Sequence, residues 1–155
     1  MKIKDIYSEN DISIQEEPFS CGPVAILNAL QLKGDSSHTE KDLIKLCGAK
    51  LGVGTSNANL VKAAKKVGLE VLEEKENASL ADIERNMNSG ASVIVCYKNA
   101  FSGNGHYTVI VEYDDSAFYC RDSAFGLFRL DKERFENHWF SPKGDFSVRW
   151  FVAVK

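Results

Sequence analysis

The hydrophobic positions in the first half of the chain recur at the three- and four-residue spacing of α-helices. This spacing predicts four helices, over residues 22–33, 40–48, 56–68 and 80–90. Thr39 and Ser79 are suited to cap the second and the fourth of them, Ser79 together with Asp82. The first helix is apolar nearly all round, with only Asn28 and Gln31 as polar positions, so we expect the other helices to pack around it.

In the second half of the chain the pattern changes to the alternation that is typical of β-strands. Strands are predicted over residues 92–97, 106–113, 117–122, 127–130 and 146–154, and a short strand over residues 70–73. The short connections favour antiparallel hairpins in a meander. Helices followed by antiparallel strands predict an α+β fold, with a helical N-terminal lobe, a C-terminal sheet and a cleft between them. Since the sequence contains no linker or repeat, we expect residues 1–155 to form a single domain.

The composition excludes several classes of protein. The 155 residues are 44% hydrophobic, which is enough to bury a continuous core. Lys and Arg number 19 against 22 Asp and Glu, a net charge of −3 with the signs interspersed, which argues against nucleic-acid binding. No apolar run is long enough to span a bilayer, and the first ten residues lack the apolar region of a signal peptide. We therefore expect a cytoplasmic protein without a membrane span.

Cys21 is the cysteine whose position favours reactivity. It precedes Gly22-Pro23 at the start of the first predicted helix. The thiolate is the nucleophilic form of cysteine, and the positive amino end of a helix dipole stabilises it. The other cysteines lie in apolar helix or strand patterns and are predicted to be core residues: Cys47, Cys96 and Cys120. Because all four are too widely spaced for a disulfide framework or a zinc site, we expect no metal and no cofactor.

A cysteine nucleophile needs a general base, and His106 is the histidine best placed to act as one. It follows a glycine-rich loop and opens the strand over residues 106–113, where it could face the helix end that carries Cys21. His38 lies in a polar loop and is predicted to be a surface residue. His138 lies in an amphipathic stretch and is predicted to be a packing or surface residue.

The group that orients His106 is predicted from the parity of the hairpin that follows it. In a regular antiparallel pair, a three-residue loop between Glu112 and Ser116 would set His106 directly opposite Asp122. A two-residue loop would send the two side chains to opposite faces of the sheet. The sequence does not decide between the two loop lengths. With the three-residue loop, Asp122 is the candidate for the orienting carboxylate.

Gln15 is the candidate for a donor to an oxyanion. It lies six residues before Cys21, far enough back for its amide to approach the helix end beside the Cys21 backbone N–H. Two such donors would form an oxyanion hole for a tetrahedral intermediate.

These residues together resemble a known family. The order Gln15-x5-Cys21-Gly22-Pro23, then Gly105-His106-Tyr107 opening an apolar strand, then Asp122 and an aromatic-rich FENHW segment, is similar to the bacteriocin-processing, double-glycine leader peptidases, which are papain-like cysteine peptidases. The intermediate helices are similar too, so the resemblance covers nearly the whole chain. It implies a papain-like fold with Cys21 as nucleophile, His106 as base, Asp122 as orienting group and Gln15 as oxyanion donor.

The resemblance also implies partners. A peptide or protein substrate is expected, and many relatives are fused to membrane and nucleotide-binding domains. This sequence has no Walker motif and no transmembrane run, so a transporter would be a separate partner. Ser123 stands where the family usually has Pro after the aspartate. Aromatic residues on the histidine side are predicted to narrow the groove, although some of them will be core: Tyr107, Phe125, Phe128 and Trp139.

Three functions are compatible with these residues. The leading hypothesis is a thiol peptidase, in which Cys21 attacks a peptide carbonyl and water hydrolyses the thioester. A non-catalytic domain that only holds peptides is less favoured, because all four site residues are present. An acyl or amide transferase would use the same triad but pass the acyl group to an amine.

Overall fold

The computed structural model describes residues 12–98, 105–139 and 149–155. Within these residues the helices are α1 (Cys21–Leu32), α2 (Glu40–Cys47), α3 (Asn57–Lys66), α4 (Leu80–Asn88) and α5 (Lys132–His138). The strands are β1 (Val71–Lys75), β2 (Ser92–Lys98), β3 (Gly105–Tyr113), β4 (Ala117–Asp122), β5 (Gly126–Asp131) and β6 (Phe151–Val154). The α+β fold and the four predicted helices are confirmed. Helix α5 was not predicted; it begins after Asp131, whose side chain accepts the Arg134 N–H.

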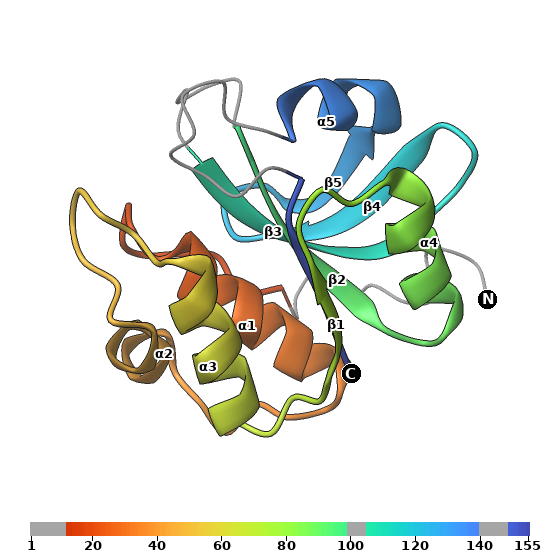
Figure 1. Ribbon diagram of the computed structural model, residues 1–155. Helices are drawn as coiled ribbons and strands as arrows, with labels where there is room; N and C mark the ends of the chain where they lie inside the picture. Colours follow the sequence, from red (N-terminus) through yellow and green to blue (C-terminus); the bar gives the residue numbers. More distant parts are fainter. Residues whose placement is uncertain (1–11, 99–104, 140–148) are drawn as a thin grey trace.

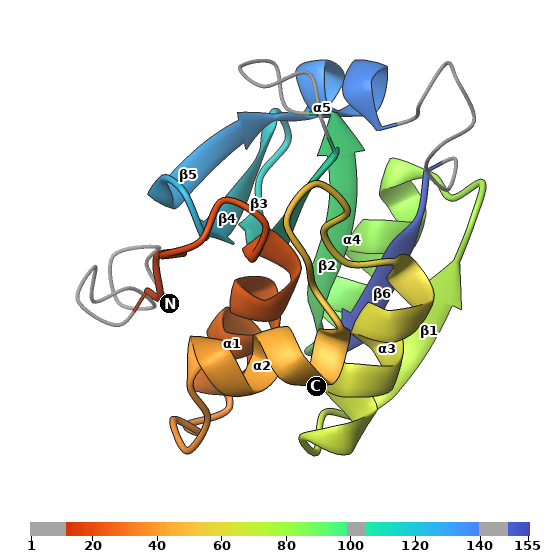
Figure 2. The same cartoon turned by 90° about the vertical axis from the view of Figure 1, so that its left-hand side faces the viewer.

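Helices cover both faces of one six-stranded sheet (Figures 1 and 2). Helices α1, α2 and α3 pack on one face, against side chains that include Ile94, Val109 and Val152. Helices α4 and α5 pack on the other face through Ile83 and Phe135. The prediction that the other three N-terminal helices pack around the first one is therefore wrong for α4. The apolar stripe of α4 packs on the far face of the sheet.

The order of strands in the sheet is β1-β6-β2-β3-β4-β5, and every neighbouring pair is antiparallel. The predicted meander is present from β2 to β5, but β6 does not follow β5. It lies between β1 and β2 instead. All four residues of β6 are buried, which suits an inner strand with helices on both faces.

The last strand is also shorter than predicted. It begins at Phe151, whereas we predicted a strand over residues 146–154; residues 146–148 lie outside the described residues. Arg149 has a φ of 49°, in the left-handed region, so the extended backbone cannot run through it.

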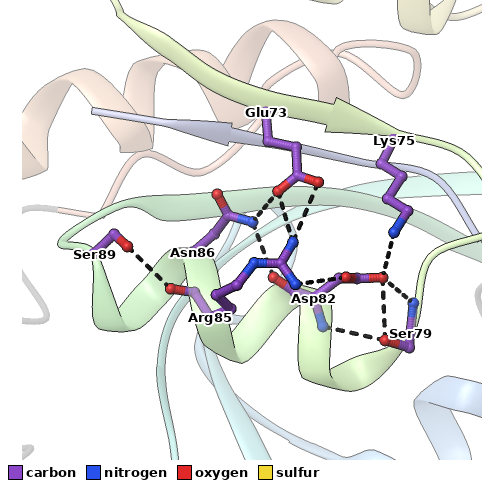
Figure 3. Close-up of polar contacts among 7 residues, drawn as sticks. All are labelled: Glu73, Lys75, Ser79, Asp82, Arg85, Asn86 and Ser89. Atoms are coloured by element: carbon purple, nitrogen blue, oxygen red, sulfur yellow. Dashed lines mark hydrogen bonds and ion pairs between the residues drawn. The ribbon is translucent and has the colours of Figure 1, made fainter.

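The sheet is anchored to α4 through its edge strand β1. Figure 3 shows Glu73 of β1 in contact with Arg85 and Asn86 of α4, and Lys75 of β1 in contact with Asp82. Asp82 also closes a capping box with Ser79. These contacts lower the pKa of Asp82, chiefly through the Ser79 backbone N–H and then through Arg85 and Lys75. These contacts hold α4 against the sheet, on the face opposite α1.

Candidate active site

Cys21 is the first residue of α1, and it is half-buried. The helix behind it is buried from Gly22 to Leu30, because nearly every side chain in that stretch is apolar. Figure 2 shows the amino end of α1 next to β3 and β4. The first turn contains no acidic residue, so no carboxylate of this turn competes with the Cys21 sulfur for the positive end of the helix dipole.

Gly22 allows the loop between α2 and α3 to approach Cys21 closely. A Cβ atom at this position would lie 3.0 Å from the side chain of Thr55 and 3.3 Å from the ring of Tyr107. The Tyr107 hydroxyl in turn donates to the backbone oxygen of Thr55 at 2.9 Å. The helix start, strand β3 and the α2–α3 loop therefore pack against one another beside Cys21.

The loop before Cys21 is held by a carboxylate that the sequence did not point to. Glu40, the first residue of α2, accepts the backbone N–H of Glu16 at 3.0 Å and the hydroxyl of Ser20. Ser20 also donates to the backbone oxygen of Glu17 at 2.9 Å. These contacts fix the turn that connects Gln15 to Cys21. No sequence signal identifies Glu40, because its partners are mostly backbone groups.

His106 and Asp122 form a buried pair. The Nε2 atom of His106 lies 2.9 Å from Oδ2 of Asp122, and the two residues are 7% and 0% exposed. Asp122 also accepts the backbone N–H groups of Ala124 at 2.7 Å and Phe125 at 3.0 Å. The imidazole is therefore held by a carboxylate that is itself fixed by the backbone.

The charges of this pair are coupled to Cys21. Burial lowers the pKa of His106, but hydrogen bonds to Asp122 and Cys21, and the charges of both, raise it to about 9. Burial raises the pKa of Asp122, while its hydrogen bond to His106 and the charge of that residue bring it below the ordinary value. Because Nε2 faces Asp122, Nδ1 is the nitrogen that remains for the Cys21 sulfur. This arrangement favours an imidazolium at neutral pH.

The strand register explains why His106 and Asp122 meet. Ile110 pairs with Cys120, and the same register, carried on, sets Asp122 opposite Thr108. His106 lies two residues from Thr108 on the same face, so the two side chains are diagonal neighbours. The direct opposition that we predicted is wrong by two residues. At the hairpin Tyr113 pairs with Phe118, three residues away from the predicted register. The bulge between Ile110 and Glu112 then shifts the pairing back by one residue, which returns His106 and Asp122 to the same face.

Gln15 is attached to the residue that follows Asp122. Its backbone N–H donates to the backbone oxygen of Ser123 at 2.8 Å, and the Ser123 hydroxyl donates to its Oε1 at 2.6 Å. Its Nε2 donates to the backbone oxygen of Glu17 at 2.8 Å. Gln15, Asp122, His106 and Cys21 are therefore linked through successive contacts.

The remaining cysteines are buried. Burial raises the pKa of Cys47 and of Cys96 to about 12, and it raises the pKa of Cys120 as well. Cys21 is half-buried and its sulfur is hydrogen-bonded to the His106 side chain, whereas Cys96 meets only the backbone of His106. The four thiols should therefore differ in reactivity.

We predict that iodoacetamide at or slightly below neutral pH alkylates Cys21 selectively. Cys21 is half-buried at the amino end of α1 beside the His106 side chain, whereas the other three sulfurs are buried and burial raises their pKa values. Peptide mapping by mass spectrometry gives the rate for each cysteine, and the urea-unfolded chain, in which all four should react alike, is the control. Equal labelling of Cys47, Cys96 or Cys120 in the folded chain would contradict the assignment.

The other histidines have local partners. Nδ1 of His38 lies 3.2 Å from the Ser37 hydroxyl, and Nδ1 of His138 lies 2.7 Å from the backbone oxygen of Arg134. Of the four aromatic residues predicted on the histidine side, Trp139 is fully buried beside Phe135 and cannot line a groove. The other three are Tyr107, which packs in the core beneath α1, Phe125, which is exposed, and Phe128, which stacks on Phe125.

Among the described residues, no three His, Cys, Asp or Glu side chains come together as a metal site requires. In the same part of the chain, none of the helices has the length and apolar character needed to cross a membrane.

Comparison with known proteins gives one family. The model of the Peptidase C39 family matches residues 9–141. An uncharacterized protein of Methanothermobacter thermautotrophicus is 32% identical over 124 residues, which are 80% of this chain and 79% of that protein.

Solved structures share the fold. The peptidase domain of Streptococcus ComA, a bi-functional ABC transporter involved in a quorum-sensing pathway, has a TM-score of 0.74 at 20% identity, over 93% of this chain and 96% of that one. A C39-like peptidase from Bacillus anthracis has a TM-score of 0.71 at 16% identity, over 97% and 96%. A double glycine motif protease from an AMS/PCAT transporter, in complex with the leader peptide, has a TM-score of 0.67 at 17% identity, over 93% and 89%.

Proposed function

Because this chain belongs to the peptidase C39 family, we propose that it is a cysteine peptidase that hydrolyses peptide bonds through Cys21, His106, Asp122 and Gln15. One observation carries the proposal. A half-buried thiol at the amino end of a core helix lies against a histidine that is hydrogen-bonded to a buried carboxylate. Nucleophile, base and orienting group are the three parts that covalent acyl transfer needs.

The reaction follows from these positions. The Cys21 thiolate attacks the carbonyl carbon of the scissile bond, and the oxyanion of the tetrahedral intermediate accepts hydrogen bonds from the Cys21 backbone N–H and Gln15 Nε2. His106 gives its Nδ1 proton to the leaving amine, and a thioester with Cys21 remains. His106 then takes a proton from water as the water attacks the thioester. The thiolate and the carboxylic acid product are released, and the imidazolium is restored.

Asp122 has a distinct role in this scheme. It accepts the Nε2 proton of His106 throughout, which keeps Nδ1 directed at the sulfur and stabilises the positive ring. The hydrogen bond and charge of His106, and after them the backbone N–H of Ala124, keep the pKa of Asp122 below its ordinary value although it is buried.

A peptide library tests the proposal directly. The library is incubated with the wild-type chain and with the Cys21→Ala variant, and the products are identified by mass spectrometry. We expect cleavage products that are absent from the Cys21→Ala sample. Peptide binding without products from either chain would favour the non-catalytic alternative, and amide products formed with an added amine in preference to acids would favour a transferase.

The pH dependence should show the raised pKa of His106. Its imidazolium is present below a pKa of about 9 and is lost as the pH rises through that value, so kcat/KM should fall on the alkaline side with a midpoint near 9. The measurement is kcat/KM for a library-derived peptide from about pH 5 to about pH 11. A midpoint near the ordinary histidine value of about 6.5 would contradict the buried, charge-assisted pair.

The substrate that we propose is a leader peptide cleaved after Gly-Gly. Support comes from the double glycine motif protease that shares this fold and holds a leader peptide. A transporter that exports the cleaved product would then be a separate partner of this chain.

We therefore predict faster cleavage of a peptide with Gly-Gly before the scissile bond than of a matched peptide with Phe-Arg there. The packed surroundings of Cys21, where Thr55 lies against Gly22, favour small side chains. The two kcat/KM values are measured by chromatography of the products. Equal or faster cleavage of the Phe-Arg peptide would leave a peptidase without double-glycine preference.

A further inference from the structure

Ser123 is a buried hydroxyl that the reaction scheme leaves without a role. It is 1% exposed and directly follows Asp122. Its hydroxyl donates to Gln15 Oε1 at 2.6 Å, and its backbone oxygen accepts the Gln15 N–H at 2.8 Å. One residue therefore contacts both the backbone and the side chain of the candidate oxyanion donor.

These contacts determine which way the Gln15 amide points. Its Oε1 meets the Ser123 hydroxyl, and its Nε2 meets the backbone oxygen of Glu17 at 2.8 Å. A flipped amide would set its oxygen against the Glu17 oxygen, two acceptors facing each other. Since Nε2 carries two hydrogens and Glu17 takes one, the other is available to an oxyanion.

We propose that Ser123 is a positioning residue for the oxyanion hole, which acts by holding the Gln15 amide with Nε2 presented to the substrate. This inference rests on the proposed function, because it assigns Gln15 to the oxyanion. A proline at this position could hold Gln15 only through its backbone oxygen, since its side chain has no donor. The side-chain contact is therefore a feature of the serine.

The Glu40 carboxylate supports the same assembly from the other side. It accepts the N–H of Glu16, the residue that follows Gln15, at 3.0 Å. The backbone of Gln15 is thus fixed on both sides, and the remaining freedom is rotation of its side chain. Ser123 removes that freedom.

The test separates the oxyanion hole from the nucleophile by using two small probes. With p-nitrophenyl acetate, the Cys21 sulfur bonds to the acyl carbon and p-nitrophenolate leaves, through a tetrahedral oxyanion. With iodoacetamide, the sulfur displaces iodide from a methylene carbon, and no oxyanion forms. The ratio of the two rates therefore measures the oxyanion hole at constant thiol reactivity.

We expect Ser123→Ala to slow acylation roughly tenfold, part of the 10²- to 10³-fold loss for a donor removed outright, and to leave alkylation unchanged. In the Gln15→Ala background, Ser123→Ala should have no further effect, because the amide through which it acts is gone. Ser89→Ala, which removes an exposed hydroxyl on the far face of the sheet, is the control and should change neither rate.

Two results would overturn the inference. One is an equal loss of acylation and alkylation in Ser123→Ala, which would indicate general damage to the site. The other is a Ser123→Ala variant whose ratio of acylation to alkylation rates equals that of the wild type, or whose loss of acylation is equally large when Gln15 is already alanine. Acylation that persists in Cys21→Ala would instead contradict the proposed function itself, so the two failures are distinguishable.

Discussion

Asp122→Asn is expected to lower kcat about 10³- to 10⁴-fold without unfolding the chain. The asparagine oxygen can still accept the N–H groups of Ala124 and Phe125, so the buried site keeps its backbone contacts. The amide nitrogen then faces His106 Nε2 in place of an acceptor. The ring must move its proton to Nδ1 to accept that bond, and the neutral ring can no longer take a proton from water at the sulfur side.

The measurement is kcat by product chromatography, together with thermal unfolding of both chains. The matched control is Asp114→Asn at the opposite end of the β3–β4 hairpin, where the exposed aspartate accepts the N–H groups of Ser116 and Ala117. This control should keep full activity. Activity within tenfold of wild type in Asp122→Asn would exclude Asp122 as the orienting group.

Gln15→Ala is expected to lower kcat by roughly 10²-fold or more, with little change in KM. One hydrogen of Nε2 is donated to the Glu17 backbone oxygen, and the other is donated to the oxyanion, which exists in the transition state and not in the bound substrate. The fold should be unaffected, because Gln15 is partly exposed and its backbone bond to Ser123 remains. Steady-state kinetics with the library-derived peptide give both constants.

Gln31→Ala is the control for this experiment. Gln31 lies near the other end of α1, where it contacts Ser13 and Arg121, so its loss should leave kcat unchanged. If Gln15→Ala retains wild-type kcat while Cys21→Ala is inactive, a group other than Gln15 stabilises the oxyanion.

The buried helix α1 could be predicted from sequence because its signal is local. An apolar stretch that follows Cys-Gly-Pro has few alternatives to a core helix with the thiol at its amino end. The contact between His106 and Asp122 could be predicted only in part. The two residues share a face only because a bulge between Ile110 and Glu112 shifts the register by one residue, and no residue type announces that bulge.

Apart from the approach of His106 to Cys21, contacts between distant segments could not be predicted. The position of β6 between β1 and β2 depends on packing over the whole sheet, and its four apolar residues fit any buried strand. Glu40 and Ser123 support the site through backbone oxygens, backbone N–H groups and one amide. Such partners are present all along a chain, so the pattern of residue types does not identify them.

The place of β6 in the sheet determines when, during synthesis, the core beneath Cys21 and its helix is complete. Val152 and Val154 of β6 belong to the same hydrophobic core as the buried side chains of α1, although the two elements lie near opposite ends of the described chain. Contacts of such large sequence separation form slowly, on the order of milliseconds to seconds. During synthesis, Cys21 leaves the ribosome early, but the surface beneath its helix is complete only when β6 has followed. A nascent chain therefore carries Cys21 well before the core beneath its helix is complete.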